Sequence, residues 1–80
     1  MAYNDTRNPL RALQRRIGAK ISIRLKDGTQ YVGVLKEFDN YMNLIMSNCA
    51  ETLNEKEPPT TYAELFIRGS NILFIKPNVE

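Results

Sequence analysis

The sequence predicts a mostly-β domain in which a short N-terminal helix precedes a strongly bent, five-stranded antiparallel sheet that forms a small barrel. Three observations support this fold class. Apolar residues recur at helical spacing near the N-terminus, and a period of two follows from Ala19 onward. Gly33 interrupts the second run of β-favouring residues, where a bulge or sharp bend is expected. At this chain length, SH3-like and OB-like barrels are the candidates.

The N-terminal helix is expected over residues 8–17, after a flexible segment of residues 1–7. Asn8 is a good N-cap, and Pro9 is tolerated at the first helical position. An apolar stripe at helical spacing should pack on the sheet, and it consists of Leu10, Leu13 and Ile17. Gly18 is a natural end for this helix, because glycine readily adopts the left-handed conformation.

The first two strands are expected to form a hairpin. Alternation runs from Ala19 to Lys26 and places three apolar residues on one buried face: Ile21, Ile23 and Leu25. Asp27-Gly28 predicts a tight turn in which both central positions have positive φ. The second strand covers residues 29–38 and bends at Gly33.

The third strand should follow a turn at Asp39-Asn40. Strand alternation places Met42, Leu44 and Met46 on one face, with Tyr41, Asn43 and Ile45 on the other. We assign one set of apolar residues to the core and to subunit contacts: Phe38, Met42, Leu44, Met46, Leu65 and Phe74.

The C-terminal half should hold two more strands after a polar, solvated loop at residues 53–60. Strand four is expected at residues 61–67 and strand five at residues 72–76, with a short turn between them. Pro77 should end strand five.

The bulk properties indicate one domain, residues 1–80, that gains stability by association, since a chain this short buries a limited share of its surface. Eleven basic and nine acidic residues leave a formal net charge of +2. That excess is too small for nonspecific phosphate binding. Any binding of nucleic acid must therefore come from a placed site.

The residue types argue against several functions. The chain has no histidine, which removes most zinc sites and His-based catalytic pairs, so neither enzyme activity, metal nor cofactor is expected. Cys49 is the single cysteine and is expected to be a small strand-end residue without chemistry. No apolar run approaches the roughly 20 residues of a membrane span. We therefore expect a soluble, cytoplasmic protein without a membrane partner.

Two segments resemble the bipartite signature of the Sm and Sm-like (LSm) protein family. The first covers residues 21–49 and includes Leu25, Asp27-Gly28, Gly33, Leu35, Phe38-Asp39 and Tyr41-Met42-Asn43-Leu44. The second is the run Ile67-Arg68-Gly69-Ser70-Asn71-Ile72. The resemblance assigns residues 19–52 to the first Sm motif, residues 53–60 to a variable loop and residues 61–77 to the second motif.

The resemblance implies the Sm fold and a ring in which strand four of one subunit pairs with strand five of the next. It implies six to eight identical subunits, with a heptamer favoured, because the simple chain is similar to archaeal single-protein rings. It also implies that U-rich single-stranded RNA lies at the pore. The protein would scaffold or chaperone RNA in the cytoplasm, or in the nucleus if its source is eukaryotic.

Three residues would bind one base in each subunit. Tyr41 would stack on the base, where many relatives have His, and Asn43 would read the uracil edge with its amide. Arg68 would stack on the other face or contact a phosphate. The structural alternatives are a half-exposed strand aromatic for Tyr41, a turn-stabilising amide for Asn43 and an ion pair with Asp39 for Arg68.

Four further positions support this site or extend it. Asp39 is expected to orient Asn43 or Arg68, and Gly69 to let the backbone approach the ligand. Ser70 replaces the Asp or Asn often seen in relatives and would contact RNA with less reach. A second RNA contact or a solvated basic face is expected for three helix residues: Arg11, Arg15 and Arg16.

Two other functions compete with the RNA-binding ring. One is a barrel used for protein assembly without specific RNA binding, and the other is an SH3-like module that binds polyproline segments. The trio of Tyr41, Asn43 and Arg68 argues against the first, since assembly alone would not need it.

Overall fold

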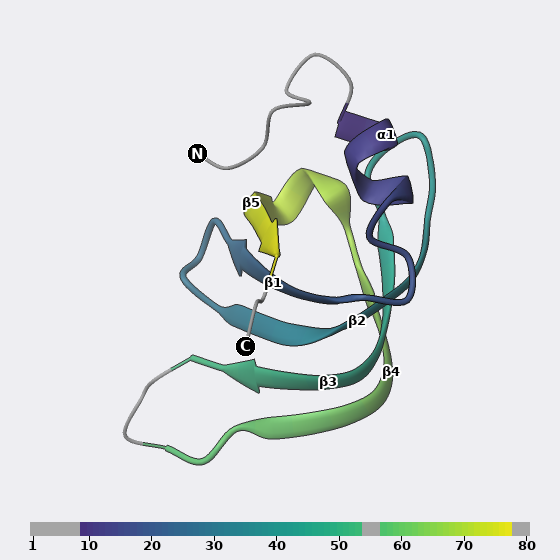
Figure 1. The fold of residues 1–80 in the computed structure, drawn as a ribbon. Coiled ribbons are helices and arrows are strands. Elements are labelled where there is room, and N and C mark those ends of the chain that lie inside the picture. The colour runs from purple at the N-terminus through teal and green to yellow at the C-terminus, as the bar shows by residue number, and fades with distance from the viewer. Residues whose placement is uncertain (1–8, 54–56, 78–80) are drawn as a thin grey trace.

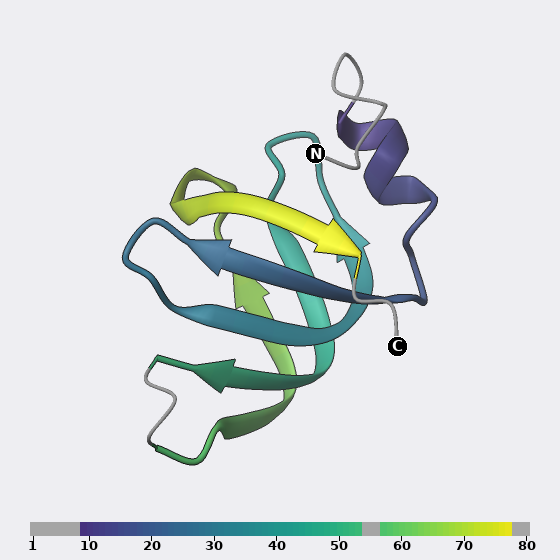
Figure 2. The same ribbon diagram turned by 60° about the vertical axis from the view of Figure 1, so that its left-hand side comes forward.

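Five antiparallel strands form one curled sheet in the order β4-β3-β2-β1-β5 (Figure 1, Figure 2). The computed structural model describes residues 9–53 and 57–77. Its elements are α1 (Pro9–Gln14), β1 (Lys20–Leu25), β2 (Gln30–Phe38), β3 (Leu44–Thr52), β4 (Thr60–Ile67), the 3-10 turn η1 (Gly69–Asn71) and β5 (Ile72–Pro77). The predicted fold class is confirmed. Strands four and five match their predicted ranges to within one residue, with Pro77 as the last residue of β5.

The sheet bends sharply at Gly33, as predicted. The register between β2 and β3 shifts between Val32 and Val34. A Cβ atom at position 33 would lie 2.8 Å from the Cα atom of Cys49, so only glycine lets the two strands approach this closely. Asn48, with φ of 48°, is the bulged residue on the facing strand.

The helix is shorter than predicted. α1 ends at Gln14, and the backbone tightens into i→i−3 hydrogen bonds, from Arg16 N–H to Leu13 O (2.8 Å) and from Ala19 N–H to Arg16 O (2.8 Å). This tightening turns Ile17 out of the predicted buried stripe, and its side chain is 50% exposed. Gly18 has the expected positive φ, 85°. The proposed N-cap, Asn8, lies outside the described residues.

The turn between β1 and β2 also differs from the prediction. Gly28 has a φ of 97°, whereas Asp27 has a negative φ, so only one of the two central positions is left-handed. Gly28 N–H donates to Leu25 O, and Thr29 N–H donates to the Asp27 carboxylate. The aspartate side chain thus completes a longer turn than the two-residue hairpin that was expected.

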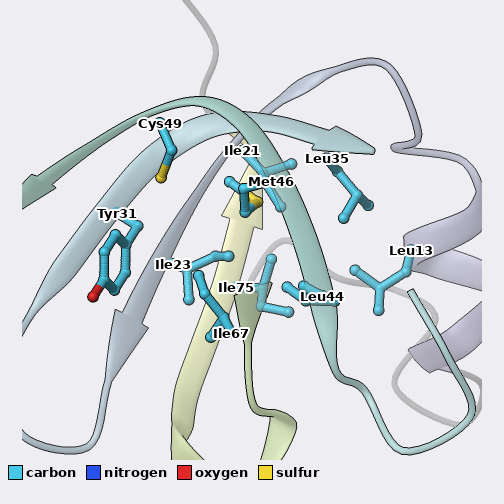
Figure 3. Close-up of a cluster of buried hydrophobic side chains, with 10 residues drawn as sticks. All are labelled: Leu13, Ile21, Ile23, Tyr31, Leu35, Leu44, Met46, Cys49, Ile67 and Ile75. Atoms are coloured by element: carbon cyan, nitrogen blue, oxygen red, sulfur yellow. The ribbon is translucent and has the colours of Figure 1, made fainter. Parts of the chain in front are cut away.

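The buried side chains converge between the curled strands (Figure 3). The completely buried ones include Ile21, Ile23, Leu35, Leu44 and Met46. α1 contributes Leu13 to this cluster and thereby covers one end of it. Cys49 is buried within β3 rather than at a strand end, and burial raises the pKa of its thiol to about 11. That thiol is therefore protonated and unreactive at neutral pH.

β4 and β5 form the two outer edges of the sheet. These strands carry large exposed apolar side chains, with Phe66 59%, Leu73 59% and Phe74 44% exposed. Phe74 was among the apolar residues predicted for the core and for subunit contacts. Its exposure shows that it is not a core residue of the single subunit, and a subunit contact remains the prediction for it. In the described part of the chain, no helix is long and apolar enough to cross a membrane.

Candidate nucleic-acid interface

The segment between β2 and β3 is a tight turn and not the beginning of a strand. Asp39 N–H donates to Asn43 O (3.1 Å), Met42 N–H donates to Asp39 O (3.0 Å), and Met42 has a φ of 67°. The prediction that strand alternation puts Tyr41 and Asn43 on one face is therefore wrong, since β3 begins only at Leu44.

Asp39 organises this turn through both of its carboxylate oxygens. Oδ1 accepts hydrogen bonds from the backbone N–H groups of Tyr41 (2.8 Å) and Asn43 (3.0 Å). Oδ2 accepts one from Nδ2 of the Asn43 side chain (2.9 Å). The hydrogen bond from the Asn43 side chain, helped by the backbone N–H groups, holds the pKa of Asp39 below its usual value. The expected orienting contact from Asp39 to Asn43 is present.

Asn43 connects the turn to a segment far away in the sequence. Its Oδ1 atom accepts the backbone N–H of Gly69 at 2.8 Å. A Cβ atom at position 69 would lie 2.2 Å from the carbonyl oxygen of Tyr41, so the contact requires glycine. The two halves of the predicted site therefore lie side by side, although β3 and β4 separate them along the chain.

The Asn43 amide keeps part of its hydrogen-bonding capacity. An amide group has two N–H donors and an oxygen with two lone pairs. Asp39 takes one donor and Gly69 one lone pair, which leaves one of each. Because both ends of the amide are held, the group cannot flip. The turn-stabilising role weighed for this residue is thus real, and it fixes the remaining donor and acceptor in place.

The flat and charged side chains of the predicted site are open to solvent. Tyr41 is 82% exposed. Arg68 is exposed and immediately precedes η1 with an extended backbone, and Ser70 is exposed within η1. Within residues 9–53 and 57–77, Arg68 makes no ion pair with Asp39, so that structural alternative is not observed.

The three arginines predicted for the helix do not all belong to it. Arg11 is on α1, whereas Arg15 and Arg16 are in the turn that follows it. Arg11 and Arg15 are exposed, and Arg16 is partly buried.

Two features of the site were missed by the sequence interpretation. One is the left-handed conformation of Met42, for which an apolar residue gives no signal. The other is the contact of the β1–β2 turn with η1, where Lys26 N–H donates to Asn71 O (2.9 Å). The turn residues around Asp27 predicted a reversal of the chain but not its neighbour in space.

Comparisons with known proteins agree in both sequence and structure. A family model described as LSM domain matches residues 11–77. The LSM complex subunit lsm6 of Schizosaccharomyces pombe is 40% identical over 68 residues, which cover 85% of this chain and 89% of that protein. The structure of a Pyrococcus abyssii Sm protein in complex with a uridine heptamer superposes with a TM-score of 0.81 at 27% identity, covering 89% of this chain and 99% of that one. A heptameric archaeal Sm protein gives 0.77 at 29% identity, covering 86% and 98%.

Proposed function

The chain belongs to the family of LSM-domain proteins, and on this basis we propose that it is a noncatalytic subunit of a ring that binds U-rich single-stranded RNA at its pore. The ring serves as an RNA scaffold or chaperone in ribonucleoprotein assembly and RNA processing. The similar Pyrococcus abyssii protein binds a uridine heptamer, and the similar archaeal protein is heptameric. A heptamer of identical subunits is the favoured assembly.

The exposed edges of the sheet support a ring. β4 and β5 lie at opposite ends of the strand order, and each carries exposed apolar side chains, Phe66 on one and Phe74 on the other. Pairing β4 of one subunit with β5 of the next would satisfy both edges and bury these side chains. A head-to-tail contact of this kind gives a closed ring when the rotation between neighbours closes.

The observation that carries the RNA assignment is the immobilised amide of Asn43. It keeps one N–H donor and one lone pair. Uracil places a carbonyl oxygen beside its N3–H group, so an amide with one donor and one acceptor left can bond both groups. Tyr41 supplies an exposed ring for stacking, worth about 1–3 kcal/mol per base. Arg68 supplies a planar cation. Within the described residues it forms no ion pair with Asp39, so that carboxylate does not compete with RNA for the guanidinium group.

The remaining predicted residues have smaller roles in this proposal. Gly69 allows the close approach of the two loops, and its N–H fixes Asn43. Ser70 contacts RNA through its backbone or hydroxyl group. Arg11, Arg15 and Arg16 form either a weaker second contact or a solvated basic face. Since the net charge is only +2, affinity comes from repeated copies of one site along a single strand.

Binding of oligo(U) and oligo(A) at one fixed salt concentration tests the proposal, together with the native mass of the particle. We expect a mass six to eight times that of the chain and a clear preference for oligo(U). Equal, weak binding of both RNAs by an intact ring would leave the assembly barrel as the function. A monomer at micromolar concentration would refute the ring.

Substitutions at the site separate RNA contacts from structure. Arg68→Ala should weaken oligo(U) binding without dissociating the ring, and Arg68→Lys should restore the charge but not the stacking plane. Lys36→Ala removes the same charge on β2, where Lys36 pairs with Glu64, and should leave RNA binding unchanged. Asn43→Ala should also weaken binding, and collapse of the ring in either Ala variant would make that residue structural.

We place the protein in the cytoplasm, with the nucleus as the alternative compartment if its source is eukaryotic. The position of a fluorescently tagged copy in the source cell tests this assignment.

A further inference from the structure

Met42 has a backbone conformation that its residue type disfavours. Its φ of 67° lies in the left-handed region, where a side chain without a local hydrogen bond to offer is rarely found. Strained backbone of this kind persists only where surrounding contacts hold it, and such residues cluster at functional sites. Met42 lies between Tyr41 and Asn43, which are two of the proposed base-binding residues.

The left-handed conformation has a specific effect on the turn. It reverses the chain so that the N–H groups of Tyr41 and Asn43 converge on a single oxygen, Oδ1 of Asp39. Converging backbone N–H groups form an anion-binding concavity, which the Asp39 carboxylate fills here. The same carboxylate holds the Asn43 amide, so the orientation of that amide depends on the conformation at Met42.

The side chain and the carbonyl group of Met42 hold this conformation from two sides. The thioether side chain is partly buried and packs against the hydrophobic core. The carbonyl group faces the Gly69 backbone, where a Cβ atom would lie 2.8 Å from its oxygen. An apolar anchor on one side and a neighbouring loop on the other leave the peptide little freedom to rotate.

We propose that Met42 is a positioning residue for base recognition, whose left-handed backbone, anchored in the core, sets the geometry of Tyr41 and Asn43. This inference rests on the proposed function. The side chain itself does not contact RNA. Its contribution is to keep the Asn43 amide oriented before RNA arrives, so that binding does not include the cost of ordering the loop.

A pair of variants with similar apolar volume isolates the backbone effect. Leucine keeps the anchor and tolerates positive φ about as well as methionine, whereas β-branched isoleucine strongly resists it. We expect Met42→Leu to bind oligo(U) nearly as the parent does. Met42→Ile should bind at least about tenfold more weakly, the equivalent of about 1.4 kcal/mol, with a smaller preference for oligo(U) over oligo(C) and an unchanged ring mass.

Amide hydrogen exchange in the RNA-free ring provides a readout that does not depend on binding. The N–H groups of Tyr41 and Asn43 should exchange faster in Met42→Ile than in Met42→Leu. If the parent prefers oligo(U) and the two variants show equal binding and equal exchange, the inference about Met42 is refuted while the proposed function stands. A parent without that preference overturns the proposed function and this inference together.

A second pair decides the matter if the isoleucine variant does not assemble. Met42→Ala and Met42→Gly both remove the anchor, but only glycine adopts positive φ without cost. Met42→Gly should therefore bind oligo(U) more tightly than Met42→Ala. At an ordinary position the order would be the reverse, because glycine makes a loop more flexible than alanine does. That reverse order would contradict the proposal.

Discussion

The side-chain oxygen of Asn43 accepts a hydrogen bond from the backbone N–H of Gly69 at 2.8 Å, and this bond joins two loops that are 26 residues apart. Asp39 holds the other end of the same amide. The proposed base site therefore consists of one rigid unit made from two segments.

Gly69→Ala should damage this unit directly. The added Cβ atom would lie 2.2 Å from the carbonyl oxygen of Tyr41, so one of the two loops must move. We expect a loss of about 1–3 kcal/mol in unfolding free energy and a marked loss of oligo(U) affinity. Chemical denaturation and RNA titration measure the two effects. Ser70→Ala, at the exposed neighbouring position, is the control for the denaturation measurement alone, because Ser70 is itself proposed to contact RNA. Its stability should be close to that of the parent.

Asp39→Asn tests the orientation of the Asn43 amide. If the new side chain turns its oxygen toward the two backbone N–H groups, its NH₂ group faces the NH₂ group of Asn43, and the hydrogen bond between them is lost. Oligo(U) affinity should fall although a negative charge near RNA has been removed. Glu57→Gln removes the same charge at an exposed position and serves as control. An affinity that rises in both variants would mean that only charge matters.

The pH dependence of RNA binding follows from the depressed pKa of Asp39. A carboxyl group with a lower pKa in the folded state contributes stability above its unfolded value, about 3.9, and loses it as the pH falls through the folded value. Oligo(U) affinity should thus be flat between pH 5 and 8 and decline only in strong acid. The chain has no histidine to add a transition near neutrality. A titration step between pH 6 and 7 would contradict this expectation.

Tyr31 should control stability at high pH. The side chain is largely buried, and its hydroxyl group donates to the Glu51 carboxylate at 2.6 Å. Burial together with this carboxylate raises the pKa of Tyr31. The neutral phenol is favoured in the folded state, so its contribution is complete below the unfolded pKa of about 10 and is lost as the pH rises toward the folded value. Denaturation midpoints should therefore drop above pH 10, and they should drop less in Tyr31→Phe, which lacks the phenol.

Tyr31→Phe should lower the unfolding free energy at pH 7 by about 1.5–3 kcal/mol, the usual contribution of a hydrogen bond to a charged group. Tyr62→Phe is the matched control, because Tyr62 donates to the same carboxylate over a longer distance, 3.3 Å, and is less buried. It should cost less. A larger loss in the Tyr62 variant would place the main contact on β4 instead of β2.

The ring contact is tested on the β5 edge. Phe74→Asp places a charge where the neighbouring subunit is proposed to pack, so the native mass should fall below that of the parent ring. Leu53→Asp adds the same charge to an exposed residue in the loop after β3 and should leave the mass unchanged. Native mass spectrometry compares the two, and an intact Phe74→Asp ring would exclude this face as the contact.

Local chemistry in the sequence was sufficient to predict the fold class. The alternation around Ile21 and Ile23, the bend at Gly33 and the left-handed Gly18 each follow from properties of a residue and its near neighbours. These features of the fold are predictable because propensity and side-chain period act over only a few residues. The two halves of the proposed base site were predicted differently, from the resemblance of the short runs around Asn43 and Arg68 to the Sm signature.

Tertiary contacts decided how those pieces are set. Gly18 N–H donates to Leu35 O, which ties the end of the helix to β2, and Ile17 is exposed beside this contact. The turn that Asp39 closes around Tyr41 and Asn43 is made of local hydrogen bonds, but the close approach of Gly69 packs a distant loop against it. The left-handed Met42 and the bond from Asn43 to Gly69 depend on a loop that the sequence places far away. A pattern of residue types does not encode which loop comes to lie beside another. Only the curled sheet brings these loops together, and it thereby decides how the predicted residues are oriented.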